Sequence, residues 1–184
     1  MFQHKEKLKD LKVEVVDDKY VINYKNETIS IYFKDEKPHS FILGDGEDAY
    51  SMKVEQSHHI IVGEGNLKRD VWHFSTPHGP LPTLRCGYTV HSGENTWSSM
   101  PHPFEENPEE GFEEVFLYLL KGGTAIQNGI GMWQNGEEIS DLWRVFDRDI
   151  SAIPMGYHPV VGEPGVHVSY IWAYLAKHKN WEKI

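Results

Sequence analysis

The chain has a single cysteine, Cys86, among its 184 residues. One thiol excludes an internal disulfide and a zinc site built from several cysteines. Nothing around Cys86 suggests a nucleophile, so we expect a small buried apolar residue. Long apolar runs are also missing, because none approaches the roughly 20 residues that span a bilayer. The opening stretch, MFQHKEKLKDLKVEVV, lacks the apolar segment of a signal peptide, so we expect a cytoplasmic protein with no membrane partner.

Positive charge is scarce as well. The formal net charge is −10, and an acidic chain repels nucleic acid, which is therefore not expected as a partner. There are four arginines, and they stand at positions 69, 85, 144 and 148. This distribution permits bidentate recognition of a carboxylate, although a surface location is the ordinary interpretation of each arginine taken singly.

Short β-prone runs separated by turn residues fill most of the chain. The runs at 13–16, 20–24 and 29–33 are separated by DDK and KNE, and they predict a β-meander. Residues 34–57 are polar with weak periodicity and predict a long loop or a lid. Further strands are predicted at 58–62, 70–75, 84–91, 114–120, 141–146, 150–153 and 167–175.

This pattern favours an all-β domain. No apolar period of 3.6 residues is sustained, and glycine and proline turns are frequent, which is typical of an antiparallel sandwich or barrel. Barrels of this kind often enclose a ligand cavity. The glycines between 122 and 136 do not have the spacing of a phosphate-binding loop, and no helix follows them.

Two stretches carry the residues that suit chemistry, WSSMPHPFEENPEEGFEEVFLYLL (97–120) and DRDISAIPMGYHPV (147–160). We expect the fold to bring His102, Glu114 and His158 together. Two histidines and a glutamate are a reasonable ligand set for a divalent metal. Eleven histidines nevertheless produce many accidental triples, so spacing alone does not require a metal.

Strand parity sets which side chains share a face. In an extended strand, Glu114 lies on the same face as Phe116 and Tyr118. The last predicted strand has an aromatic face of the same kind, made of Val168, Tyr170, Trp172 and Tyr174. Such a face either stacks on a sugar ring or simply fills the core.

The first stretch resembles the metal-binding segment of the uronate isomerase branch of the cupins, which comprises 5-keto-4-deoxyuronate isomerase and 5-deoxyglucuronate isomerase. The shared features are W-S-S, a Pro-His element, an acidic insertion and Glu-Glu-Val with aromatics. PMGYHPVV resembles the family's P-x-G-Y-H-P element, and the tripeptide at 69–71 resembles a shorter upstream element. The resemblance implies a cupin-type double-stranded β-helix (jelly-roll) barrel at 61–184, with an N-terminal β extension at 1–60 packing on it.

The resemblance also implies the metal ligands. The first histidine of the family's His-x-His falls on His102, the glutamate on Glu114 and the final histidine on His158. The second histidine of His-x-His falls on Phe104, which cannot bind a metal. His91, Glu105 and Glu106 are possible replacements, although the two glutamates are more simply interpreted as a solvated acidic loop. The implied cofactor is a divalent transition metal, zinc first, with manganese, nickel or iron as alternatives.

The implied function is an aldose–ketose shift on a deoxy sugar acid, which makes a small-molecule sugar acid the expected partner. Tyr157 and a histidine that binds no metal are the candidates for the general base, and Tyr157 is also a residue that shapes a turn. Arg144 is a candidate for holding the substrate carboxylate if it points inward with Leu142 and Phe146; an outward position is equally consistent. We also expect a homodimer, because cupins commonly pair through their sheets.

Two other function classes stay open. Phe104 favours a cupin without a metal that binds a sugar or sugar acid and catalyses nothing. The cupin fold also hosts other metal chemistry, such as dioxygen activation or epimerisation. Metal content, turnover and oxygen uptake distinguish these classes.

Overall fold

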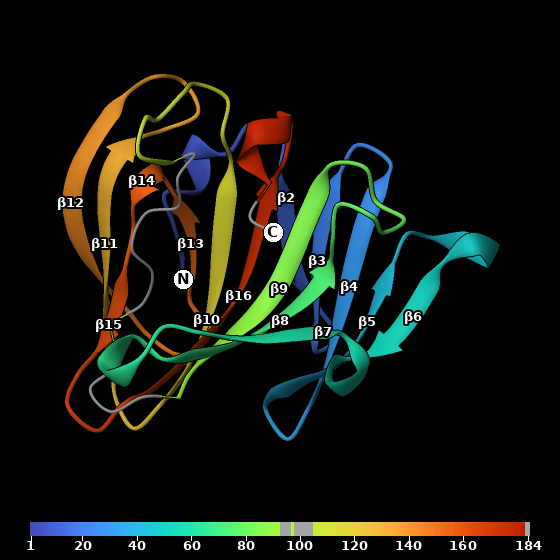
Figure 1. Ribbon diagram of the computed structural model, residues 1–184, viewed down its shortest axis with the longest axis horizontal. Coiled ribbons are helices and arrows are strands. Elements are labelled where there is room, and N and C mark those ends of the chain that lie inside the picture. The colour runs from blue at the N-terminus through green and yellow to red at the C-terminus, as the bar shows by residue number, and fades with distance from the viewer. Residues whose placement is uncertain (93–96, 98–104, 183–184) are drawn as a thin grey trace.

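The computed structural model describes residues 1–92, 97 and 105–182, and it consists of three stacked β-sheets (Figure 1). In Figure 1 the four-stranded sheet stands on one side, the seven-stranded sheet in the middle and the five-stranded sheet on the other side. The described helices are single 3₁₀ turns: η1 (Lys5–Lys7), η2 (Gly46–Asp48), η3 (Val54–Gln56), η4 (Gly65–Leu67) and η6 (Lys179–Trp181).

The seven-stranded sheet is the central layer and carries most of the predicted strands. Its neighbours pair antiparallel, except for the parallel pair of β1 and β13 at one edge. In spatial order it contains β1 (Phe2–Gln3), β13 (Ile150–Ile153), β10 (Glu114–Lys121), β16 (His167–Leu175), β9 (Leu84–His91), β8 (Arg69–Ser75) and β7 (His58–Val62).

The four-stranded sheet faces the central layer across the cavity side of the molecule. It consists of β12 (Glu138–Val145), β11 (Ala125–Met132) and β14 (Met155–Tyr157), with β15 (Val160–Gly162) also paired to β11. Two antiparallel sheets that face each other, built largely from non-adjacent strands, form a jelly roll. The predicted all-β fold is therefore confirmed.

The N-terminal strands form a sheet of their own. The β-meander continues through five strands: β2 (Lys12–Val16), β3 (Lys19–Tyr24), β4 (Glu27–Lys34), β5 (Lys37–Leu43) and β6 (Tyr50–Lys53). The turns at Asp17–Asp18 and Asp35–Glu36 have positive φ at both residues, as type I′ hairpins require. The predicted loop or lid at 34–57 is wrong, because it contains β5 and β6. In β5 the side chains of Phe41 and Leu43 point into the core. This alternation of apolar and polar residues is too short to predict a strand among its polar neighbours.

The middle strands of the central sheet are buried on both faces, so the protein has two apolar cores. Along β10, Val115, Leu117 and Leu119 pack toward the five-stranded sheet, whereas Phe116 and Tyr118 pack toward the four-stranded sheet. The predicted parity of this strand is thus observed. Cys86 lies in the first core with no exposed surface, and burial raises the pKa of its thiol.

Two buried carboxylates join the layers through backbone N–H groups. Glu27 accepts hydrogen bonds from the backbone nitrogens of Thr83 at 2.8 Å and Leu84 at 2.7 Å. Glu113 accepts three such bonds from consecutive residues of the N-terminal segment, 9–11. Among the described residues, no helix has the length and apolarity needed to cross a membrane.

Candidate functional site

A cavity of about 170 Å³ lies on the concave face of the central sheet, between it and the loop that carries His158. The cavity is formed by alternate residues of five neighbouring strands, since side chains two apart share a face. Its lining residues are Ile60, Val62, Arg69, Val71, His73, Thr89, Glu114, Phe116, His158, Tyr170 and Trp172.

The aromatic wall of the cavity is held by specific contacts. The Trp172 indole nitrogen donates a hydrogen bond to the Thr89 hydroxyl at 3.1 Å. Gly87 makes room for the indole, because a Cβ at that position would lie 2.3 Å from a ring carbon of Trp172. Phe116 and Tyr170 stack with their ring centroids 4.5 Å apart. These contacts fix an apolar wall on one side of the cavity, as in most small-molecule sites.

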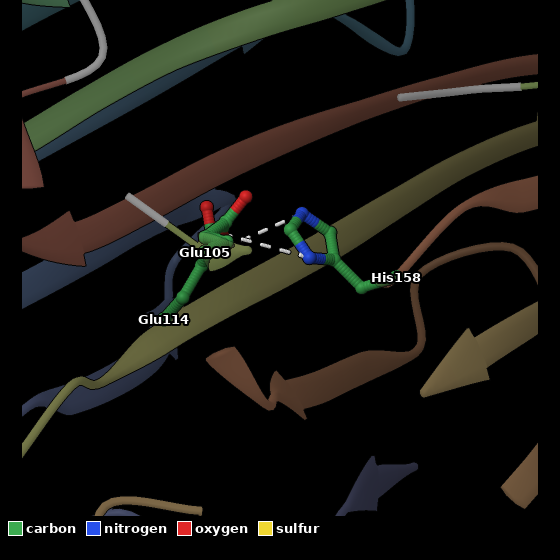
Figure 2. Close-up of side chains that lie close together, drawn as sticks. All are labelled: Glu105, Glu114 and His158. Carbon is green, nitrogen blue, oxygen red and sulfur yellow. Dashed lines mark ion pairs between the residues drawn. The ribbon is translucent and has the colours of Figure 1, made fainter. Parts of the chain in front are cut away.

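One end of the cavity holds three buried ionisable side chains, Glu105, Glu114 and His158 (Figure 2). Glu114 begins β10, Glu105 comes from the preceding loop, and His158 follows β14. The ring nitrogens of His158 lie 3.6 Å from Glu105 Oε1 and 3.7 Å from Glu114 Oε2. Side-chain exposure is 1% for His158 and 0% for each glutamate. Figure 2 shows the two carboxylates side by side, with the imidazole directed at them.

The backbone sets the tautomer of His158. Its Nδ1 lies 2.8 Å from the carbonyl oxygen of Gly156, so Nδ1 carries the proton and donates it to that carbonyl. This leaves the Nε2 lone pair directed to the side of Glu114. In most metal sites, the histidine ring nitrogen that does not bind the metal makes a hydrogen bond of this kind, which orients the ring. β14 and β15 pair with β11 in one continuous register, so His158 lies in the extended segment between them and the turn expected at Tyr157 is not observed. This segment presents one ring nitrogen of His158 to the cavity.

The donor set fits a divalent cation. The three groups each offer one ligand atom, and these atoms all lie within 4.8 Å of one another. A transition metal with bonds of about 2.0–2.2 Å holds its ligand atoms about 3–3.5 Å apart, so small side-chain adjustments suffice. Two neighbouring carboxylates withdrawn from water repel each other, and a cation between them relieves that repulsion. Oxygen and imidazole donors suit zinc, manganese, nickel and iron.

The structure brings together two of the three predicted ligands, Glu114 and His158. His102 and Phe104 lie outside the described residues. Glu105 corrects the interpretation of a solvated acidic loop, because its side chain is buried beside His158. His91 is not part of this group; it lies opposite Arg69 on paired strands, with its ring edge-on to Tyr170 at 5.9 Å.

The other two predicted residues lie away from the cavity. Tyr157 pairs with Ile130, whose side chain is 48% exposed, so both side chains belong to the outer face of the four-stranded sheet. Arg144 has a side chain that is 63% exposed and lies 3.9 Å from Glu163. The outward orientation of Arg144 is thus the one that the structure has. The face of β12 that carries Arg144 is exposed to solvent. The alternation of residues along a strand does not show which of its two faces is exposed.

Sequence reasoning missed two ionisable residues of the cavity, Arg69 and His73. Both belong to β8, where positions 69, 71 and 73 share the concave face. His73 is 5% exposed, and its ring lies edge-on to Trp172 at 5.5 Å. The signal was present in the alternation of RDVWHFS, but nothing in the sequence said which face is concave.

Comparison with known proteins decides the family. A model of the KduI/IolB family matches residues 39–184, which is most of the chain. The chain belongs to the KduI/IolB family. Two curated proteins named 5-deoxy-glucuronate isomerase are similar to it over 149 residues. The Geobacillus kaustophilus protein is 27% identical and the Geobacillus thermodenitrificans protein 24%.

These relatives differ from the chain in length. The matched region covers 76% of this chain but 52% and 53% of the two curated proteins, so the chain spans about half of their length. An IolB-like protein of Salmonella typhimurium has the same fold, with a TM-score of 0.61 and 17% identity. The match covers 94% of this KduI/IolB member and 73% of that chain. The predicted cupin-type jelly roll is confirmed.

Proposed function

We propose that this KduI/IolB member is a metal-dependent isomerase that interconverts the aldose and ketose forms of a deoxy sugar acid. The observation that carries the proposal is the buried Glu105, Glu114 and His158 group at one end of an aromatic-walled cavity. Its relatives named 5-deoxy-glucuronate isomerase support 5-deoxyglucuronate as the substrate to test first.

Glu105, Glu114 and His158 would hold the metal, and His102 remains a predicted further ligand. Zinc is the first expectation, with manganese, nickel and iron as alternatives. When bound, a divalent ion supplies Lewis acidity toward a carbonyl and its neighbouring hydroxyl. The Gly156 carbonyl contributes by keeping the proton of His158 on Nδ1, away from the ligand position.

The remaining cavity residues would bind and orient the sugar and move its proton. Phe116, Tyr170 and Trp172 offer a flat apolar wall that excludes water from the reacting carbons. An aldose–ketose shift requires a base that moves a proton between adjacent carbons. His73 lines the cavity, is not part of the three-residue group and carries an imidazole, the side chain that most often serves as a general acid or base. We therefore assign that role to His73 in the proposed reaction.

The second candidate is a cupin that binds a sugar acid without a metal and without turnover. Phe104 favours it, since this position carries a histidine ligand in the family pattern that the sequence resembles. Metal content and turnover separate the two candidates directly.

The experiment is elemental analysis of protein purified without a metal-affinity tag, followed by an isomerisation assay with 5-deoxyglucuronate. We expect about one equivalent of a transition metal in the native protein. His158→Ala and Glu114→Gln should each lose most of it. Glu113→Gln is the matched control, because Glu113 is the adjacent carboxylate that faces away from the cavity and binds backbone N–H groups.

The outcomes discriminate clearly. His73→Gln should keep its metal and lose at least about a hundredfold in kcat, the usual contribution of a general base. Unchanged metal content in both His158→Ala and Glu114→Gln would reject the ligand assignment. A metal-free protein that still binds sugar acids after incubation with zinc, manganese, nickel and iron salts would replace the isomerase proposal with the second candidate.

A further inference from the structure

We propose that Arg69 binds the carboxylate of the sugar acid, so that the substrate lies in the cavity with its acid end at Arg69 and its carbonyl end at Glu105, Glu114 and His158. This inference rests on the proposed function and deepens it. It makes the protein specific for sugars whose carboxylate and reacting carbonyl stand at opposite ends of the carbon chain. The assignment replaces Arg144 in the role that the sequence had suggested for an arginine.

Arg69 is placed for this role by its strand. It is the first residue of β8, and it shares the concave face with Val71 and His73, which also line the cavity. It pairs with Val62 of β7 on one side and with His91 of β9 on the other. Among the described residues that line the cavity, Arg69 is the one side chain with a permanent positive charge. The cavity therefore has an acidic group at one position and a cation at another.

Arg69 differs from the other three arginines in its partners. Arg85 forms an ion pair with Glu182 at 2.9 Å, Arg144 lies 3.9 Å from Glu163, and Arg148 lies 3.9 Å from Asp147. Within the part of the chain that the structure describes, Arg69 has no such carboxylate partner. A partly buried guanidinium without a counter-ion is a binding site for an anion, since its fork of N–H donors matches a carboxylate.

The nearest carboxylate in the sequence does not neutralise Arg69. Asp70 follows it directly, but alternate residues of a strand face opposite ways. Asp70 instead lies 2.8 Å from the Nε2 atom of His59, a residue on the outer face of β7. Arg69 itself donates one hydrogen bond from Nη1 to the Leu67 carbonyl at 2.8 Å. This bond orients the guanidinium and leaves its other donors available to a ligand.

His91 keeps the surroundings of Arg69 free of negative charge. Its side chain is buried, and neither ring nitrogen has a hydrogen-bond partner among the described residues. Burial first, and then the positive charge of Arg69, lower the pKa of His91 to about 3. A neutral imidazole beside the guanidinium cannot take the place of a substrate carboxylate.

The Glu105, Glu114 and His158 group would repel a substrate carboxylate placed beside it. Glu105 and Glu114 are both buried, and a third carboxylate beside them adds like charge unless a metal compensates fully. Arg69 offers the same carboxylate a cation at a different position of the same cavity. The acid end is therefore attracted to Arg69, and the uncharged carbonyl end is left for the Glu105, Glu114 and His158 group.

The test uses D-glucuronate and its neutral amide, D-glucuronamide, which differ only in the charged end. Their affinities are measured by isothermal titration calorimetry on native protein, Arg69→Gln and Arg69→Lys, with chemical denaturation to verify folding. We expect the native protein to bind glucuronate at least about tenfold more tightly than glucuronamide, as a bidentate charged pair allows. Arg69→Gln should lose this preference and keep its affinity for glucuronamide. Arg69→Lys should retain part of the preference.

Arg148→Gln is the matched control, and Arg144→Gln tests the competing arginine. Loss of the preference in Arg144→Gln, an equal loss of both ligands in Arg69→Gln, or no glucuronate binding by the native protein would each overturn the proposal. The assay with 5-deoxyglucuronate keeps the two proposals separate. Binding that depends on Arg69 without any turnover would reject the isomerase function alone. Turnover with an unchanged KM in Arg69→Gln would reject the role of Arg69 alone.

Discussion

Glu113 and Glu114 are adjacent in sequence, yet the structure gives them opposite tasks. Glu114 faces the cavity, whereas the carboxylate of Glu113 is 0% exposed on the other side of the strand. Glu113 Oε2 accepts backbone hydrogen bonds from Lys9 at 3.0 Å, Asp10 at 2.9 Å and Leu11 at 2.9 Å. Its other oxygen lies 3.4 Å from the Lys177 ammonium. We therefore predict that Glu113→Gln destabilises the protein without affecting the metal.

The magnitude follows from the hydrogen bonds. A bond to a charged acceptor contributes about 1 kcal/mol more than a bond to a neutral one. Three N–H bonds lose that assistance in Glu113→Gln, so the free energy of unfolding should fall by about 3 kcal/mol. Part of the loss is moderated by water, because the Lys9 and Asp10 nitrogens are only partly buried.

The assay is urea denaturation of the native protein, Glu113→Gln and Glu114→Gln, followed by both fluorescence and circular dichroism. Glu114→Gln is the comparison, because it removes one of two facing buried carboxylates. In metal-free protein it should leave stability unchanged or raise it. A loss below about 0.5 kcal/mol in Glu113→Gln would refute the idea that this carboxylate fastens the N-terminal segment to the central sheet.

Two further predictions concern pH and assembly. Burial and the charge of Arg69 lower the pKa of His91 to about 3, whereas the unfolded chain binds that proton near pH 6.5. The free energy of unfolding should therefore fall by up to about 4 kcal/mol as the pH drops from 6.5 to 3. Denaturation at a series of pH values should give a flatter profile for His91→Gln, and identical profiles would contradict the assignment. The expected homodimer is proposed to form through the outer face of the four-stranded sheet, where Ile130 is 48% and Leu142 is 62% exposed. Ile130→Asp with Leu142→Asp should convert it to a monomer by light scattering; a dimeric double variant would exclude this face.

Local alternation in the sequence was sufficient for much of the fold. The alternation of Glu114, Phe116 and Tyr118 with apolar residues predicted which side chains share a face of β10, and the structure has that arrangement. The DDK separator predicted a turn between the first strands, and Asp17 and Asp18 form a hairpin turn with positive φ at both residues. Such signals are local, because alternation and turn chemistry depend on neighbouring residues only.

Concavity and burial depend on contacts between segments far apart in the sequence, and only the structure shows them. Alternation places Arg69 on one face and Asp70 on the other, but only the packing of three sheets makes one face concave. The same packing buries Glu105, which looked like part of a solvated loop, and leaves Arg144 exposed. A residue's burial depends on segments far away in sequence, whereas its own neighbours determine only its direction. The sequence by itself therefore determined the strands of the central sheet apart from β1, the faces of β10, and the Glu114 and His158 candidates. Only the tertiary structure chose the carboxylate and the arginine that join them at the cavity.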